Sequence, residues 1–226
     1  MAKVSKSEAD YQPTPNGPEQ CAGCAMFKAE SYSCTTVAGV ILSIFGAAAK
    51  RSGYPVLRKV VAAYVELIRN TPFLVQLFFI FFGLPRFGIR LDPVVAAMLA
   101  MTLNMTAYTT EIVGSGLDAV PKGQREAAAA LGLPTWLVFI KIVLPQALKV
   151  IFPALTSQII IMMLESAVVS QIAVRELTYE ADMLQARTFR AFETYFIVTL
   201  VYLGMSIGLR RLLFAAGQRA IAGGMA

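Results

Sequence analysis

Three cysteines near the start of the chain are the first side chains whose type and spacing could do chemistry. They follow the pattern Cys21-x2-Cys24-x9-Cys34, and thiolates are the ligands of iron–sulfur clusters and of many zinc sites. A fourth ligand is missing, because no cysteine follows Cys34 and the chain contains no histidine. The sequence therefore predicts a cluster-like but incomplete set that holds no metal, and it excludes Ser-His-Asp and Cys-His catalysis.

A second group of candidate side chains consists of polar residues inside long apolar segments. Polar groups are costly in a bilayer, so they are functional candidates that face a cavity or a partner. The competing interpretation is that they only pack or form hydrogen bonds between helices. The substrate-pathway candidates are Asn104, Thr106, Glu111, Gln158, Glu165, Ser166 and Ser170.

The sequence also limits which partners and cofactors we expect. It has no GxxxxGK[ST] phosphate-binding loop, so any ATP that drives the protein must be hydrolysed by another subunit. The net charge is +6, but the basic residues lie between apolar runs rather than along one face. We therefore expect no enzymatic activity, no cofactor and no nucleic-acid partner.

The elements that must position these residues are membrane helices. Hydrophobic residues make up 57% of the 226 residues and charged residues only 15%, whereas a soluble domain averages about 25% charged residues. The apolar segments predict an all-α integral membrane protein with about five transmembrane helices. These segments cover residues 35–49, 54–84, 93–113, 150–174 and 194–214. The first is short, because fifteen residues make only about 22 Å of helix.

The distribution of basic residues predicts how the helices are oriented. If residues 114–149 are cytoplasmic and the spans alternate, the cytoplasmic loops and the C-terminus hold eleven Lys and Arg residues. The external loops then hold five. The positive-inside rule favours this arrangement, with a periplasmic N-terminus and a cytoplasmic C-terminus.

The cytoplasmic loop has an ordered design. Pro121 and Gly123 predict a turn, and residues 124–131 are strong helix formers. Glu126 is expected in the first turn of that helix, where its charge suits the helix dipole. Gly132 allows the left-handed backbone that ends a helix, and Pro145 is expected to break the following segment. An ordinary loop helix is the competing interpretation.

At this loop the sequence resembles the EAA loop of ATP-binding-cassette importer permeases. The resemblance lies in Glu126-Ala127-Ala128, in Gly132 and in the block that ends at Leu144-Pro145. It implies that the loop helix docks into a cleft on the ATPase subunit. The ATPase-coupling residues would be Gly123, Glu126, Ala127, Ala128, Gly132, Leu144 and Pro145. Residues 64–85, 104–112 and 164–177 resemble the polar amino acid permeases of the histidine/glutamine type, although Glu165 replaces a frequent Lys.

The N-terminus does not fit that family. Residues 11–40 resemble the front half of a high-potential iron–sulfur protein, with the fourth cysteine missing. We therefore divide the chain into a polar, irregular N-terminal tail (residues 1–34) and a transmembrane permease domain (residues 35–226). One hypothesis is that the chain is a junction of two genes near residue 40, and the other is that it carries an unusual native tail.

The resemblance implies a permease subunit that translocates a polar amino acid across the bacterial inner membrane. Its expected partners are ATP-binding-cassette subunits, a periplasmic solute-binding protein, a second permease subunit (identical or different) and membrane lipid. Three alternatives remain. The chain could be a membrane-anchored redox protein, a non-functional fusion with an iron–sulfur protein fragment, or a permease for another small polar solute.

Overall fold

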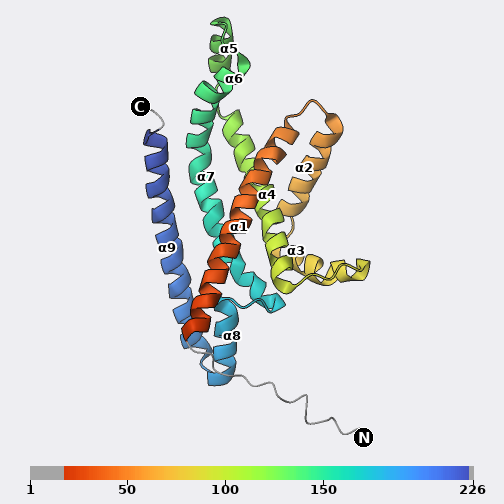
Figure 1. Ribbon diagram of the computed structural model, residues 1–226, viewed down its shortest axis with the longest axis vertical. Helices are drawn as coiled ribbons and strands as arrows, with labels where there is room; N and C mark the ends of the chain where they lie inside the picture. The colour runs from red at the N-terminus through yellow and green to blue at the C-terminus, as the bar shows by residue number, and fades with distance from the viewer. Residues whose placement is uncertain (1–17, 224–226) are drawn as a thin grey trace.

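A computed structural model of the chain describes the backbone of residues 18–223 and the side chains of residues 32–218. The described residues are helical and contain no strand, as the sequence predicts. The helices run along one long axis, with α5 and α6 at one end of the bundle and α8 at the other (Figure 1). The fold is therefore a helix bundle with a short helical cap at each end.

Helix α1 (Pro18–Lys50) is longer than its apolar segment predicts. The expected irregular tail ended at residue 34, but the backbone is already helical from Pro18 onwards. The part that is long and apolar enough to cross a membrane is Tyr32–Lys50, 19 residues in length. The helix gains the length that residues 35–49 lacked by including Tyr32 and Cys34.

The second span is broken in the middle. Helix α2 (Pro55–Arg69) is followed after three residues by α3 (Phe73–Phe78), and the two helical stretches are bent by 109°. Pro72 lies at the break and begins α3, because proline has no amide hydrogen to donate to the preceding turn. The helix then widens to a π-turn, η2 (Phe79–Gly83), and ends in η3 (Leu84–Phe87).

Helix α4 (Pro93–Asp118) lies at the centre of the bundle. It begins at Asp92, whose Oδ1 accepts a hydrogen bond from the Val94 amide at 2.9 Å. It contacts α1, α2, α3 and the long helix α7 (Leu144–Glu165). Its polar residues lower its hydropathy, so it is not among the three described helices that qualify as spans by length and composition. Those three become four if the α2–α3 pair counts as one span.

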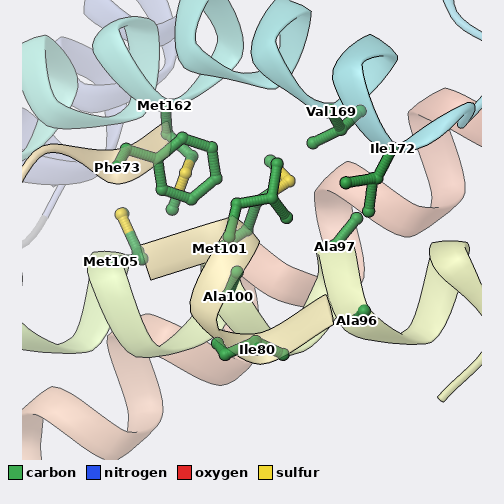
Figure 2. Packing of buried hydrophobic residues seen from close by; sticks show 11 residues of the cluster. Phe73, Ile80, Ala96, Ala97, Ala100, Met101, Met105, Met162, Val169 and Ile172 are labelled. Carbon is green, nitrogen blue, oxygen red and sulfur yellow. The ribbon is translucent and has the colours of Figure 1, made fainter. Parts of the chain in front are cut away.

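The main core joins α3, α4 and α7. Figure 2 shows Phe73 of α3 beside Met162 of α7, with Met101 and Met105 of α4 next to them. Leu77 and Met105 are fully buried. Because the polar residues of α3 and α4 adjoin this core, their side chains are held in fixed positions.

The remaining elements close the bundle at its two ends. The connection from α4 to α7 contains α5 (Lys122–Ala130), α6 (Thr135–Val138) and the π-turn η4 (Phe139–Val143). After α7 the chain continues through η5 (Ser166–Ile172) and α8 (Leu177–Thr188). The last helix, α9 (Ala191–Gly223), packs against α7 and α8 and returns to the end that holds α5 (Figure 1).

Candidate functional site: a loop helix and a broken span

The helix of the α4–α7 connection ends as the sequence predicts. Gly132 has φ +72°, the left-handed region that favours glycine. Its amide donates to the Ala129 carbonyl at 3.0 Å, and the Leu133 amide donates to the Ala128 carbonyl at 3.2 Å. These two bonds form a Schellman motif. They fix the direction in which the chain leaves α5.

Helix α5 has one buried side, which holds Ala128, and one exposed side with little side-chain bulk, which holds Gly123, Glu126 and Ala127 (the bare side). Ala128 is 2% exposed and packs with Val120, Val138 and Ala147 in a second apolar cluster. Gly123, Glu126 and Ala127 are exposed, and a Cβ added at Gly123 would meet no atom within 4 Å. The bare side therefore offers backbone and one carboxylate to a partner, with little side-chain bulk.

Two details of this loop differ from the expectation. Helix α5 begins at Lys122, with Pro121 as its N-cap, so Gly123 lies inside the helix rather than in a turn. Glu126 consequently lies in the second turn. The dipole effect is confined to the first turn, and the carboxylate of Glu126 is left for another interaction.

Pro145 does not break the helix that carries it. Helical structure continues from Thr135 to Ile172 as one candidate span. The π-turn η4 lies directly before Leu144 and Pro145, which are the first two residues of α7. A wider turn tolerates the missing amide hydrogen of proline, so α6 continues into α7 without an interruption.

Hydrogen bonds hold the loop against the ends of both long helices. Arg125 donates to the Leu117 carbonyl of α4 at 2.8 Å. The Gln146 amide donates to the side chain of Gln124 and to the Ile142 carbonyl. A force applied to α5 would therefore reach α4 and α7 together.

The broken span holds a buried polar network that sequence reasoning missed. Gln76 of α3 is 9% exposed. Its Nε2 donates to the carbonyls of Ile68 at 2.7 Å and Thr71 at 2.9 Å, which the break has released from helical bonding. Its Oε1 accepts from Asn104 Nδ2 of α4 at 3.2 Å. A glutamine four residues after Pro72 in an apolar run was the available signal.

Asn104 is the pathway candidate whose surroundings support a role beyond packing. It is 2% exposed, and its Oδ1 is buried without a hydrogen-bond partner among the described residues. A buried acceptor left unpaired costs about 1–3 kcal/mol. This oxygen is therefore available to a donor that the described residues do not supply.

Three other candidates make hydrogen bonds within their own helical segments. The hydroxyls of Thr106, Ser166 and Ser170 donate to carbonyls three or four residues earlier, Thr102, Met163 and Ala167, at 2.6–2.8 Å. This pattern is common for hydroxyl side chains within helices. Ser166 also lines a small pocket with Tyr32, Met101 and Glu176.

Glu111 lies in an ion pair near the end of the bundle that holds the α4–α7 loop. Its Oε2 is 2.6 Å from Lys50 Nζ, and both side chains are about a third exposed, at 38% and 29%. Further along α4, Arg51, which directly follows α1, contacts Asp118 at 2.7 Å and the Gly114 carbonyl at 2.6 Å. The Glu111 carboxylate therefore links α1 to α4 at one end of the bundle.

Two candidates on α7 lack a side-chain partner in the described part of the chain. Gln158 is 6% exposed. Glu165 is half-buried, and its Oε2 is buried without a hydrogen-bond partner there. Asn104 and Glu165 are therefore the candidates with a buried oxygen that the described residues do not satisfy.

A buried carboxylate that the sequence does not single out lies at the opposite end. Glu176 is 5% exposed and caps α8, because its Oε1 accepts from the Tyr179 amide at 2.9 Å. Its Oε2 accepts from the Tyr202 hydroxyl of α9 at 2.8 Å. Glu176 therefore joins α8 to α9.

The cysteine set lies mostly outside the described side chains. The side chains of Cys21 and Cys24 lie outside the described residues, whereas Cys34 is free and exposed. Among the described residues, no group of three His, Cys, Asp or Glu side chains is placed to hold a metal ion.

Known proteins resemble this chain in sequence and in fold. The sequence profile of the family described as the binding-protein-dependent transport system inner membrane component matches residues 39–221. The chain belongs to this family. It is therefore a multi-pass protein of the inner membrane, as the apolar helices indicate.

Individual family members are similar over most of the chain. The probable glutamine permease GlnM of Bacillus subtilis strain 168 is 38% identical over 65% of this chain and 68% of its own length. The arginine permease ArtQ of the same organism is 36% identical over 74% of this chain and 77% of its own length.

Solved structures share the fold. A chain of an amino acid ABC transporter crystallised with histidines has a TM-score of 0.80 and 36% sequence identity. The match covers 86% of this chain and 91% of that one. A chain of the methionine transporter MetNI has a TM-score of 0.65 at 21% identity over 87% and 92% of the two chains, which supports the fold alone.

Proposed function

We propose that this permease subunit imports a polar amino acid and is driven by ATP that separate cassette subunits hydrolyse. The names of its relatives support the cargo class, because GlnM is described as a glutamine permease and ArtQ as an arginine permease. The family description supports delivery of the cargo by a separate binding protein. A second permease subunit, identical or different, would complete the membrane part.

The observation that carries this proposal is the bare side of α5. Gly123, Glu126 and Ala127 are exposed there, while Ala128 on the other side is buried in the cluster that joins α5 to α7. A short helix with bare backbone allows a close approach by a second protein, and Glu126 can pair with a basic residue of that protein. Gly132, Leu144 and Pro145 would set the direction of α5 and its connection to α7.

Three side chains support a pathway between α3, α4 and α7. Asn104 and Glu165 each hold a buried oxygen that the described chain does not satisfy, and Gln158 is a buried amide on α7. A carboxylate with an unpaired oxygen favours a cationic cargo such as arginine, lysine or histidine. Glu111, Thr106, Ser166 and Ser170 support the walls of the pathway through local contacts.

The orientation follows the charge distribution. The end of the bundle that holds α5 and the end of α9 would face the cytoplasm, and the end that holds α8 would face the periplasm. The positive-inside rule supports this orientation, because the proposed cytoplasmic loops and C-terminus hold eleven Lys and Arg residues, against five in the external loops.

Transport assays with the reconstituted complex test which amino acid the permease carries. The chain would be expressed with the ATPase and binding-protein genes adjacent to its own, and uptake of labelled arginine, histidine, glutamine and glutamate would be followed with and without ATP. We expect ATP-dependent uptake, and we expect Glu165→Gln to reduce uptake of a cationic amino acid more than tenfold while glutamine uptake changes little. Equal loss for every amino acid would contradict the role of Glu165 in cargo selection.

We further propose that the first 40 residues derive from a different gene. Support comes from the cysteine spacing of residues 21–34 and from the family match, which begins only at residue 39. Genomic or transcript sequencing reads that cross the codons for Val40 and Ile41 test this hypothesis. Continuous native coverage in independent isolates would contradict a fusion.

A further inference from the structure

The corner between α8 and α9 places a large apolar side chain in an unfavourable backbone conformation. Phe189 follows the last residue of α8 and has φ 56° and ψ 22°, in the left-handed region. Its amide donates to the Gln185 carbonyl at 2.8 Å and ends the helix. Glycine usually occupies this position, because a side chain there is strained. The strain requires a compensating interaction of the phenyl ring.

That interaction is not made within the described chain. Phe189 is 90% exposed, and Phe192, three residues later, is 79% exposed. Exposed phenylalanine is unfavourable in water. Both rings therefore need an apolar surrounding that lies outside the described chain.

The surface next to the corner identifies that surrounding. The ring of Phe192 stacks on Phe196, with centroids 6.1 Å apart. Phe196 and Leu200 are 56% and 51% exposed and continue the same stripe along α9. Residues Ala191–Gln218 form a candidate span with none of its apolar window buried inside the chain. The two rings thus lie at the point where a bilayer-facing stripe begins.

Two basic residues flank the aromatic ring. Arg187 and Arg190 are exposed, and neither makes an ion pair among the described residues. The nearby carboxylate of Asp182 is engaged by the Tyr195 hydroxyl at 2.5 Å. Arginine forms charge-assisted, bidentate hydrogen bonds with phosphate, so the pair complements the phosphate layer of a bilayer surface.

The corner is held rigidly. The Arg190 carbonyl accepts from both the amide and the hydroxyl of Thr194, at 3.2 and 2.8 Å. Glu176 and Tyr202 join α8 to α9 on the inner side. These bonds hold α8 and the start of α9 together around the corner that carries the exposed Phe189.

We infer that residues Arg187–Phe192 form a lipid anchor at the membrane boundary. Phe189 and Phe192 insert beneath the phospholipid headgroups, and Arg187 and Arg190 bind the headgroup phosphates. Aromatic and basic side chains are typical of this interface. The anchor fixes the height of α8 relative to the bilayer surface, and it does not depend on which amino acid is carried.

Tryptophan quenching in vesicles tests the anchor. The full chain with Trp136→Phe and Phe189→Trp would be reconstituted into phosphatidylcholine vesicles containing lipids brominated either just below the headgroup or deep in the acyl chains. We expect bromines just below the headgroup to lower the fluorescence of the tryptophan at position 189 at least twofold. Bromines deep in the acyl chains and aqueous acrylamide should lower it far less. The control is Leu131→Trp in the same background, because Leu131 is 79% exposed on the loop at the other end. We expect acrylamide to quench the control.

Two outcomes would overturn the inference. Quenching of the Phe189→Trp variant by acrylamide but not by brominated lipid would mean that the corner faces water, where a protein partner can reach it. Quenching by neither would mean that a second copy of the chain covers it. Adding Arg187→Gln and Arg190→Gln to the Phe189→Trp variant should reduce the effect of the shallow bromines. An unchanged effect would contradict the phosphate contacts.

Discussion

At the scale of single residues, the buried amides of Gln76 and Asn104 explain how a broken span is tolerated. The break releases backbone carbonyls where water is scarce, and Gln76 Nε2 satisfies those of Ile68 and Thr71. Asn104 then holds Gln76 in place from α4. The polar residues of the second and third spans therefore act as one network.

Gln76→Leu should destabilise the protein more than Asn104→Leu. The first change leaves the Thr71 carbonyl without its donor, at a cost of about 1–3 kcal/mol for a buried group. It also removes the shortest of the hydrogen bonds to the Ile68 carbonyl, which keeps those from the Thr71 amide and hydroxyl. The second loses one hydrogen bond but also removes the unpaired Oδ1. Thermal unfolding of the detergent-purified protein would compare the two variants, and an equal or reversed order would contradict this network.

The ion pair between Lys50 and Glu111 should show reciprocal coupling. Glu111→Lys places two like charges at the 2.6 Å contact and should lower the unfolding temperature. Adding Lys50→Glu should restore much of the loss. A double-mutant cycle isolates the pair, whose coupling we expect to be about 1 kcal/mol because both side chains are partly exposed. No recovery in the double variant would argue that Glu111 acts elsewhere.

At the scale of elements, α1 packs closely along α4. A Cβ added at Gly39 would lie 2.7 Å from Met105 Cγ, and one added at Gly46 would lie 2.5 Å from Thr110 Oγ1. The absence of side chains at these two glycines lets the helices approach closely, as is common in membrane bundles. The first helix is therefore an integrated part of the described bundle.

Gly39→Ala and Gly46→Ala should each lower the unfolding temperature, because the added methyl group forces α1 away from α4. Gly204→Ala is the matched control. It lies within α9, where an added Cβ meets nothing within 4 Å, and alanine favours the helix there by about 1 kcal/mol. We expect the control to be neutral or stabilising. A loss of stability equal to that of the two α1 variants would contradict the close packing of α1 against α4.

At the scale of the whole molecule, the sequence predicted what depends on patterns within a segment. Apolar runs located the long helices, and Gly132 located the end of α5, because a left-handed residue is a local requirement. Contacts between segments were not predictable in this way. The Gln76–Asn104 pair and the Glu176–Tyr202 pair join residues 28 and 26 positions apart. The continuity of α7 through Pro145 required a π-turn that composition alone does not encode.

The orientation of the bundle can be tested in intact cells. We expect a membrane-impermeant maleimide to leave a cysteine placed at Gly123 unlabelled and to label one placed at Arg90, in a chain whose three native cysteines are replaced by serine. Both positions are exposed, so the comparison depends on the side of the membrane. Labelling in the reverse pattern would contradict the proposed orientation.

The most direct test of the central claim is ATP-driven uptake by the assembled transporter carrying Glu126→Lys. The bare side of α5 is proposed as the contact with the ATPase, so this variant should assemble in the membrane, lose ATP-dependent uptake and lose stimulation of ATP hydrolysis by cargo. Glu193→Lys makes the same charge reversal at an exposed position on the opposite end of the bundle and should transport normally. Unchanged uptake with Glu126→Lys would contradict the account of α5 as the coupling element.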